Sequence, residues 1–168
     1  MAHFSNLIKR EMEVMNRLQD NVHTTFLNRN KDRDSWSKAC EKFHSYISPI
    51  DQEIDKIYET SELTDPETIE FVITFLELDP MFFRSGYIKE DMIQKLKRQE
   101  LTQKQLNRIT LILIDAAKNR GQREFKSYCR LAKVMSSDLL IKSLKSIIEL
   151  QNGACKSRSK LMLGYIST

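Results

Sequence analysis

The sequence predicts an all-α protein built from antiparallel helical hairpins, and two observations lead to this fold class. The 168 residues include only 4 glycines and 3 prolines, whereas these two residues together usually make up roughly 12% of a protein. This low content argues against β-sandwiches, barrels and glycine-rich phosphate loops, because each needs many tight turns or positive φ angles. Apolar residues also recur every three to four positions along most of the chain, which is the spacing of amphipathic helices. The length favours one domain spanning residues 1–168.

Residues 1–60 are predicted to form an N-terminal group of helices. Over residues 4–26 the apolar side chains follow a helical period, which predicts one amphipathic helix of roughly 25 residues. The polar stretch that follows has no apolar side chain and is expected to be a loop. Asp34 or Ser35 is then expected to cap a second helix. Pro49 interrupts that helix or starts a third.

Residues 63–166 are predicted to contain six helices paired as three hairpins. Each hairpin starts with side chains that can cap a helix. These starting segments are Leu63-Thr64-Asp65, Leu101-Thr102-Gln103 and Ser136-Ser137-Asp138. Ser85 is expected to cap the second helix of the first hairpin, and Gly121 fits the left-handed position after the helix that begins near Thr102. The linker at residues 81–83 is expected to fold back as an apolar plug between layers.

The hairpins recur with a period typical of helical repeat proteins. Their starting segments are 38 and then 34–35 residues apart, and a two-helix unit of this size is the mark of a helical solenoid. Residues 154–161 (ACKSRSKL) resemble the second helix of a HEAT repeat, in which an early basic residue precedes small residues and leucines. Ser159 stands where alanine is usual. The resemblance covers residues 63–166 and implies a short HEAT-like α-solenoid with an N-terminal helical extension; an irregular helical bundle is the alternative.

Charge is distributed unevenly along the chain. Residues 1–83 carry a net charge of −7 and residues 84–168 a net charge of +11, within a total of +4. Ten carboxylates lie between Asp51 and Asp79 beside a single lysine, and residues 84–133 contain thirteen Lys or Arg against five Asp or Glu. Such segregation bears on partners and steering rather than on fold. The two regions are expected to face partners, to be solvated faces, or to pack against each other.

No catalytic or metal-binding pattern is complete in the sequence. Cys40 and His44 are four positions apart on a predicted helix, but a structural zinc site needs four ligands, usually as two close pairs. Glycine is too scarce for a nucleophile elbow, and all three histidines lie within the first 44 residues. Arg17 and His23, with five residues between them, resemble the motif of the HEPN ribonucleases, which implies a metal-independent ribonuclease as a third hypothesis. We therefore expect no enzyme activity, no catalytic residue, no metal and no cofactor.

The N-terminus and the three cysteines bear on location. The first ten residues include the charged Lys9 and Arg10, and the segment lacks the apolar core of a signal peptide. The longest apolar run, residues 111–114, is far shorter than the roughly 20 residues that cross a bilayer. An odd number of scattered cysteines does not form a disulfide framework. We expect a cytoplasmic protein that neither contacts membranes nor takes a small-molecule substrate.

The sequence favours a non-catalytic interaction module, an adaptor or a subunit of a larger assembly, that docks a protein partner through its acidic and basic faces. The alternative is nucleic-acid binding by the basic surface of residues 84–133. If the hairpins stack, basic residues of this region, Lys104, Arg108 and Lys118 among them, would form one stripe. The residues expected to contact the partner are Arg84, Lys97, Arg98, Arg108, Arg123 and Arg130.

Overall fold

The computed structural model describes residues 2–82, 84–121 and 123–168, and within these ranges the chain forms nine α-helices and no strand. The prediction of an all-α fold is therefore confirmed. The helices in chain order are α1 (Ala2–Leu27), α2 (Arg33–His44), α3 (Asp51–Glu59), α4 (Pro66–Leu78), α5 (Ser85–Leu96), α6 (Gln103–Asn119), α7 (Phe125–Val134), α8 (Asp138–Leu150) and α9 (Gly153–Ser167). Over the same ranges, no helix combines the length and the apolar character that crossing a membrane requires.

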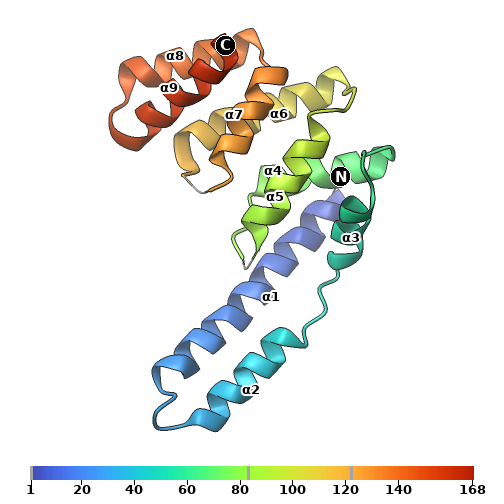
Figure 1. The fold of residues 1–168 in the computed structure, drawn as a ribbon, viewed down its shortest axis with the longest axis vertical. Helices are drawn as coiled ribbons and strands as arrows, with labels where there is room; N and C mark the ends of the chain where they lie inside the picture. Colours follow the sequence, from blue (N-terminus) through green and yellow to red (C-terminus); the bar gives the residue numbers. More distant parts are fainter. Residues whose placement is uncertain (1, 83, 122) are drawn as a thin grey trace.

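Helices α1 and α2 form a long hairpin, here called the arm, that projects away from the other helices (Figure 1). The first turns of α1 anchor the arm, because Phe4 and Ile8 are buried. The ring of Phe4 lies 5.4 Å from the ring of Phe71 in α4, edge to face. Helix α2 packs along α1 and buries Ala39 against it. Towards the tip the packing thins, and Leu27 is 67% exposed.

The cap of α2 differs from the prediction. Asp32, and not Asp34 or Ser35, occupies the capping position, and its Oδ1 accepts a hydrogen bond from the backbone N–H of Ser35 at 3.0 Å. Arg33 and Asp34 belong to the first turn of the helix, where a carboxylate interacts favourably with the positive end of the helix dipole. The prediction was wrong because apolar periodicity does not mark a first turn made of polar residues.

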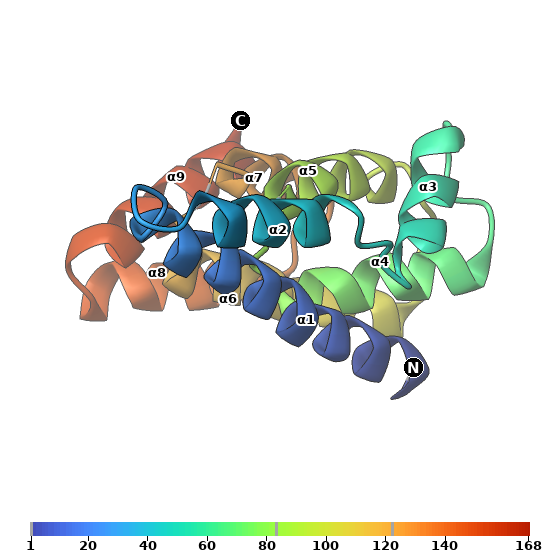
Figure 2. The same ribbon diagram turned by 90° about the horizontal axis from the view of Figure 1, so that it is seen from below.

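Helices α4 to α9 form three hairpins whose members lie in two layers. Helices α4, α6 and α8 contact one another in succession in one layer, and α5, α7 and α9 do so in the other. Figure 2 shows the layers as two rows. The two helices of each hairpin belong to opposite layers and contact each other, and α3 lies against α4 and α5. Each hairpin therefore buries apolar surface both within itself and against the next hairpin.

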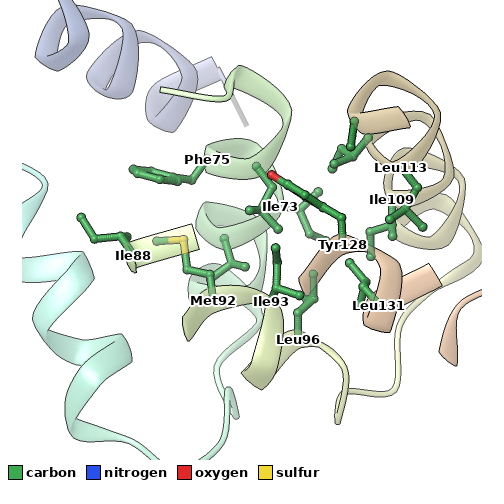
Figure 3. Packing of buried hydrophobic residues seen from close by; sticks show 14 of the residues in the cluster. Ile73, Phe75, Ile88, Met92, Ile93, Leu96, Ile109, Leu113, Tyr128 and Leu131 are labelled. Atoms are coloured by element: carbon green, nitrogen blue, oxygen red, sulfur yellow. The ribbon is translucent and has the colours of Figure 1, made fainter. Parts of the chain in front are cut away.

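The core lies between the two layers and includes residues of α4, α5, α6 and α7. Those that Figure 3 labels are Ile73, Phe75, Ile88, Met92, Ile93, Leu96, Ile109, Leu113, Tyr128 and Leu131. Tyr128 is fully buried, at 0% exposure, and its ring extends from α7 towards Ile73 of α4 (Figure 3). Burial of each large apolar side chain contributes about 1.5–3 kcal/mol, which makes this cluster the main source of cohesion between the hairpins.

Local capping accounts for the three predicted hairpin starts. Asp65 accepts from the backbone N–H of Thr68 at 2.8 Å, and proline occupies the first turn after it. Thr102 and Gln105 form a reciprocal capping box. Ser137 accepts from the backbone N–H of Leu140 at 3.2 Å. These three predictions are confirmed, because each depends on residues close together in the sequence.

Two other predicted helix ends are wrong. Gly121 is not left-handed, because the chain leaves α6 through Arg120 in an extended conformation. Ser85 lies inside α5, while Arg84 takes the capping position with φ 68°; the Ser85 hydroxyl instead accepts from the backbone N–H of Phe82 at 3.2 Å. In both places, contacts with other helices determine how the chain turns.

The predicted plug between α4 and α5 is found at one residue. Phe82 is partly buried against the core, with its ring 6.3 Å from that of Phe75, edge to face. Met81 is 50% exposed. Phe83, the third member of the linker, lies outside the described residues.

Candidate functional site

Part of the charge segregation seen in the sequence is neutralised inside the molecule. Arg108 on α6 lies in the same layer as α4, and its guanidinium bridges two carboxylates of that helix. Its Nε donates to Glu77 Oε1 at 2.7 Å, and its Nη1 donates to Glu70 Oε2 at 2.5 Å. The hydrogen bond to Glu77 and the one to Glu70 raise the pKa of Arg108 above its ordinary value. The acidic and basic regions of the sequence therefore meet at Arg108.

A second contact between the two regions is buried. Lys89 on α5 is 0% exposed, and its Nζ lies 2.6 Å from Asp79 Oδ1 and 3.1 Å from Glu124 Oε1. Asp79 ends α4 in the left-handed conformation, and Glu124 directly precedes α7. One ammonium group thus joins α5 to both neighbouring segments. A buried charge needs such partners, because desolvating it alone would cost several kcal/mol.

Arg120 completes the connection from the end of α6. It is 4% exposed; its Nη1 donates to the carbonyl oxygen of Leu76 at 2.7 Å and to the Tyr128 hydroxyl at 3.1 Å. Its Nε lies 2.6 Å from Asp115 Oδ2. Burial alone would lower the pKa of Arg120, but the Tyr128 hydroxyl and the Asp115 carboxylate raise it above the ordinary value. This guanidinium therefore holds α4, α6 and α7 together, and its contacts stabilise the fold.

The exposed face of α7 carries basic residues that, unlike Lys89 and Arg120, are open to solvent. Lys126, Arg130 and Lys133 are exposed, and Arg123 precedes the helix on the same side, at a spacing of three or four residues. We call these four residues the α7 stripe. At 1.5 Å per residue it is about 15 Å long. Helix α7 contains no acidic residue, so no carboxylate of its own helix neutralises the stripe.

Arg123 is held in place by helix α5. Its guanidinium lies 3.9 Å from the centroid of the Tyr87 ring, and its Nη2 lies 3.4 Å from Glu90 Oε2. Gly86 lies beside this contact, and a Cβ at that position would be 3.3 Å from Oε2 of Glu124. The side chain is still 53% exposed. A stacked and exposed guanidinium is oriented for a partner without further ordering.

Two other predicted contact residues lie at the opposite end of α5. Lys97 donates from Nζ to Gln94 Oε1 at 3.2 Å, and Arg98 is exposed. Lys97 and Val134, the last residue of α7, line one cavity of about 410 Å³. The structure therefore brings Lys97 to the C-terminal end of the α7 stripe, with Arg98 next to it in the chain.

Arg84 lies at the start of α5, exposed, and lines a second cavity together with Tyr87. Because Tyr87 also supports Arg123, Arg84 belongs to the N-terminal end of the same surface. The expected single stripe across the hairpins is not formed, because Lys104, Arg108 and Lys118 are on α6 in the opposite layer. Of the six predicted contact residues, Arg108 is the one placed away from the surface of α5 and α7.

The acidic region retains an exposed part after its internal pairing. Glu70, Glu77 and Asp79 are engaged by Arg108 and Lys89. Exposed carboxylates remain on α3 and between α3 and the first turn of α4; we call them the acidic face. They are Asp55, Glu59, Glu62, Asp65 and Glu67.

The residues considered for chemistry are not gathered into one centre. Cys40 is a half-buried free thiol and His44 is exposed. Within the described ranges, no group of three or more His, Cys, Asp or Glu is arranged to hold a metal ion. Arg17 is exposed, and its Nε donates to the carbonyl oxygen of Glu13 at 3.3 Å. His23 is exposed and lines a groove on the arm. The ribonuclease hypothesis stays a prediction.

Sequence reasoning missed Lys89 and Arg120 as structural cations, although a signal for both was present. Lys89 recurs with Met92 and Leu96 on the apolar face of its helix, and Arg120 follows Ala116 by four positions on the face of α6 that is buried. A cation at a core position of a helical period indicates a buried charged partner.

No family model, curated protein or solved structure matches the chain. The resemblance of residues 63–166 to HEAT repeats therefore stays a prediction.

Proposed function

We propose that this protein is a non-catalytic interaction module, an adaptor or a subunit of a larger assembly, whose three hairpins form a short HEAT-like α-solenoid. The α7 stripe binds an acidic surface of a protein partner, and the acidic face provides a second, oppositely charged contact. The alternating contacts of α4, α6 and α8, and of α5, α7 and α9, support the solenoid arrangement.

The observation that carries the proposal is the contrast between two kinds of cation. Lys89, Arg108 and Arg120 are buried or half-buried and are paired with carboxylates of this chain. Lys126 and Arg130 are exposed and form no ion pair with any described residue. Cations that do not stabilise their own fold, gathered on one helix without a carboxylate, supply charge complementarity to a partner.

A protein partner fits this surface better than a nucleic acid. The stripe is about 15 Å long. A single row of side chains of this length is small beside the roughly 600–1,000 Å² of surface that even single DNA-binding modules bury. Its C-terminal end adjoins Val134, which is 57% exposed, and a cavity partly lined by Leu101, Leu106 and Met135. The lining of this cavity is of mixed polar and apolar character, and charged residues beside such a depression are typical of protein interfaces, where a few side chains fill pockets.

The test is recovery of partners by affinity purification from the native cells, with and without nuclease treatment. We expect a stoichiometric protein partner that survives nuclease. The double variant Arg123→Glu/Arg130→Glu should lose it, because reversing two charges turns attraction into repulsion.

The matched control is Lys142→Glu/Lys145→Glu, which reverses two exposed charges on α8 in the other layer. It should retain the partner, and circular dichroism should show that both variants stay folded and helical, although Arg123→Glu gives up the contacts of Arg123 with Tyr87 and Glu90. Recovery of the same partner by the Arg123→Glu/Arg130→Glu variant would remove the proposal.

Nucleic-acid binding is the second candidate, favoured by the absence of acidic residues from both α7 and the adjoining α9. Recovery of nucleic acid alone, or of a partner that nuclease removes, would put this candidate first. The salt dependence of binding then counts the contacts, because the logarithm of the affinity falls with that of the salt concentration by about 0.9 per phosphate neutralised on duplex DNA.

A further inference from the structure

A cavity of about 490 Å³ lies at the root of the arm, and one of its lining residues, Tyr87, also contacts Arg123 of the α7 stripe. Its lining comes from α1, from the end of α2 and the segment that joins it to α3, from α3 itself, from the linker before α5 and from the start of α5. Segments distant in the sequence thus meet around one opening. Neither the adaptor function nor the charge pattern of the sequence accounts for it.

Glu11 is the buried acid of this cavity. The residue is 2% exposed, and its Oε2 accepts a hydrogen bond from the Tyr46 hydroxyl at 2.9 Å. Its Oε1 is buried and has no hydrogen-bond partner among the described residues. Buried carboxylate oxygens are nearly always bonded, because a lone one loses its hydration without compensation. Oε1 can therefore accept a hydrogen bond from a donor that the described residues do not supply.

The Tyr46 hydroxyl is the hydrogen-bond donor to this acid. Burial, together with the hydrogen bond to Glu11, raises the pKa of Tyr46 to about 12. The phenol therefore stays protonated at neutral pH and acts as the donor, while Glu11 acts as the acceptor. The hydrogen bond occupies Oε2 of Glu11 and leaves Oε1 without a donor among the described residues.

Other charged groups around the cavity add to its negative character. Asp51 and Asp55 line it together with Glu11, against one guanidinium, that of Arg84, and the imidazole of His44. Asp51 is half-buried, with its Oδ2 accepting from the backbone N–H of Ser48 at 2.9 Å. Three carboxyl groups thus line the cavity beside one guanidinium, and this excess of acidic side chains favours a cation over an anion.

Aromatic rings supply a second part of the lining, beside aliphatic side chains. Tyr46, Tyr58 and Tyr87 all border the cavity together with Phe43 and Phe82. The faces of aromatic rings attract cations, and they shield the methylene groups of an organic ion from water. Bare metal ions instead require several oxygen, nitrogen or sulfur ligands, and no such group of three is present among the described residues. The lining thus favours an organic cation.

We propose that this cavity binds an alkylammonium ion, whose N–H donates to Glu11 Oε1 while its carbon chain lies against the tyrosine rings. The ammonium pairs with the carboxylate that would otherwise stay uncompensated, and Asp51 and Asp55 are available to the second charge of a diamine. The site adjoins the docking surfaces proposed above, because Asp55, Arg84 and Tyr87 line it too, but its ligand contact at Glu11 belongs to neither surface.

The test titrates 1,4-diaminobutane into the full chain by calorimetry and by amide NMR, at an ionic strength held constant with sodium chloride. Saturable binding is expected, with shifts at the amides of Tyr46 and Tyr58. Tetramethylammonium should bind at least tenfold more weakly, because it has no N–H to donate. Absence of saturable diamine binding up to about 10 mM, a Kd corresponding to roughly −2.7 kcal/mol, would overturn the proposal, as would equal binding of the two ions.

A pair of matched variants locates the site. Glu11→Gln keeps an acceptor for Tyr46 but removes the charge, and should weaken diamine binding at least tenfold. Glu13→Gln, an exposed position on the same helix, should bind as the wild type does. Unchanged affinity in Glu11→Gln would also overturn the proposal. If Glu11→Gln does not fold, Tyr58→Leu, at a position 50% exposed, should reduce the affinity several-fold, and unchanged affinity there would have the same consequence.

A single lysine in a short peptide, N-acetyl-lysine methylamide, distinguishes a free amine from a side chain of a partner. Binding of this compound as tight as that of the diamine supports an alkylammonium presented by a protein, and weaker binding supports a free amine. Both outcomes support the same chemistry at Glu11.

Discussion

Lys89 and Glu124 form an ion pair at 3.1 Å, although the two residues are 35 positions apart and their side chains are only 1% and 2% exposed. Asp79 contacts the same ammonium at 2.6 Å. The pair fixes the start of α7 against α5, and α7 carries the surface proposed for docking. The buried pair of Lys89 and Glu124 therefore helps to determine where the exposed cations of the α7 stripe lie.

Replacing Lys89 by methionine should lower the free energy of unfolding by about 3–5 kcal/mol, because the carboxylate of Glu124 would be left buried and unpaired. Urea denaturation followed by circular dichroism measures the loss. Lys126→Met, which removes an exposed lysine from α7, should change stability by less than about 0.5 kcal/mol. A loss below about 1 kcal/mol in Lys89→Met would contradict the expected role of the pair.

Replacing Arg108 by lysine should destabilise the protein by about 1–2 kcal/mol even though the charge is kept. A lysine ammonium lacks the planar fork of donors that engages Glu70 and Glu77 together. Thermal and urea denaturation provide the measurement. Arg98→Lys, at an exposed position, is the control that should be neutral. Equal stability of the Arg108→Lys variant and the wild type would show that the fold does not need a guanidinium that binds Glu70 and Glu77 at the same time.

Acid should destabilise the fold partly through Glu70. Burial alone would raise the pKa of this carboxyl, but hydrogen bonds from Arg108 and Gln105 lower it below its ordinary value of 4.5. A carboxyl whose pKa is lower in the folded state stabilises the protein above the unfolded pKa, and this contribution is lost as the pH falls through the folded pKa.

The free energy of unfolding should therefore decrease as the pH drops below about 4.5. Asp115, whose pKa is also lowered, should contribute at somewhat lower pH. Urea denaturation at a series of pH values from neutrality to about 3 tests this. The slope should be shallower in Glu70→Gln, and an unchanged slope in that variant would contradict the assignment.

The three cysteines should differ in reactivity. Burial raises the pKa of the Cys129 thiol to about 11, so at pH 8 it is protonated and shielded from reagents. Cys40 and Cys155 are half-buried free thiols. A colorimetric thiol reagent should modify two groups per folded chain and the third only in urea. The Cys129→Ala variant should show the same count of two when folded, and three fast thiols in the folded wild type would contradict the burial of Cys129.

The sequence predicted those features that depend on neighbours in the chain. The caps at Asp65, Thr102 and Ser137 are local hydrogen bonds, so residue types and spacing were sufficient to predict them. The conformation after α6 was mispredicted, because Arg120 turns back to α4 and leaves Gly121 without a left-handed role.

The same distinction applies to the candidate surface. Arg123 and Arg130 were chosen because they lie in the basic stretch of residues 84–133, and Arg108 was grouped with them because its partners were not evident. Glu70 and Glu77 precede Arg108 by 38 and 31 positions, and only the packing of α4 against α6 brings them together. The cavity at Glu11 was not predicted for the same reason, since its lining combines segments that the sequence keeps apart.

Position 79 accepts very few amino acids. Asp79 adopts a left-handed backbone with φ 47° and ψ 54° while its carboxylate contacts Lys89. Glycine would suit the backbone but would remove the charge, and asparagine tolerates the conformation but is neutral. Glutamate would restore the charge at a backbone geometry that it adopts poorly. Aspartate alone meets both demands, so the turn between α4 and α5 and the burial of Lys89 both depend on one side chain.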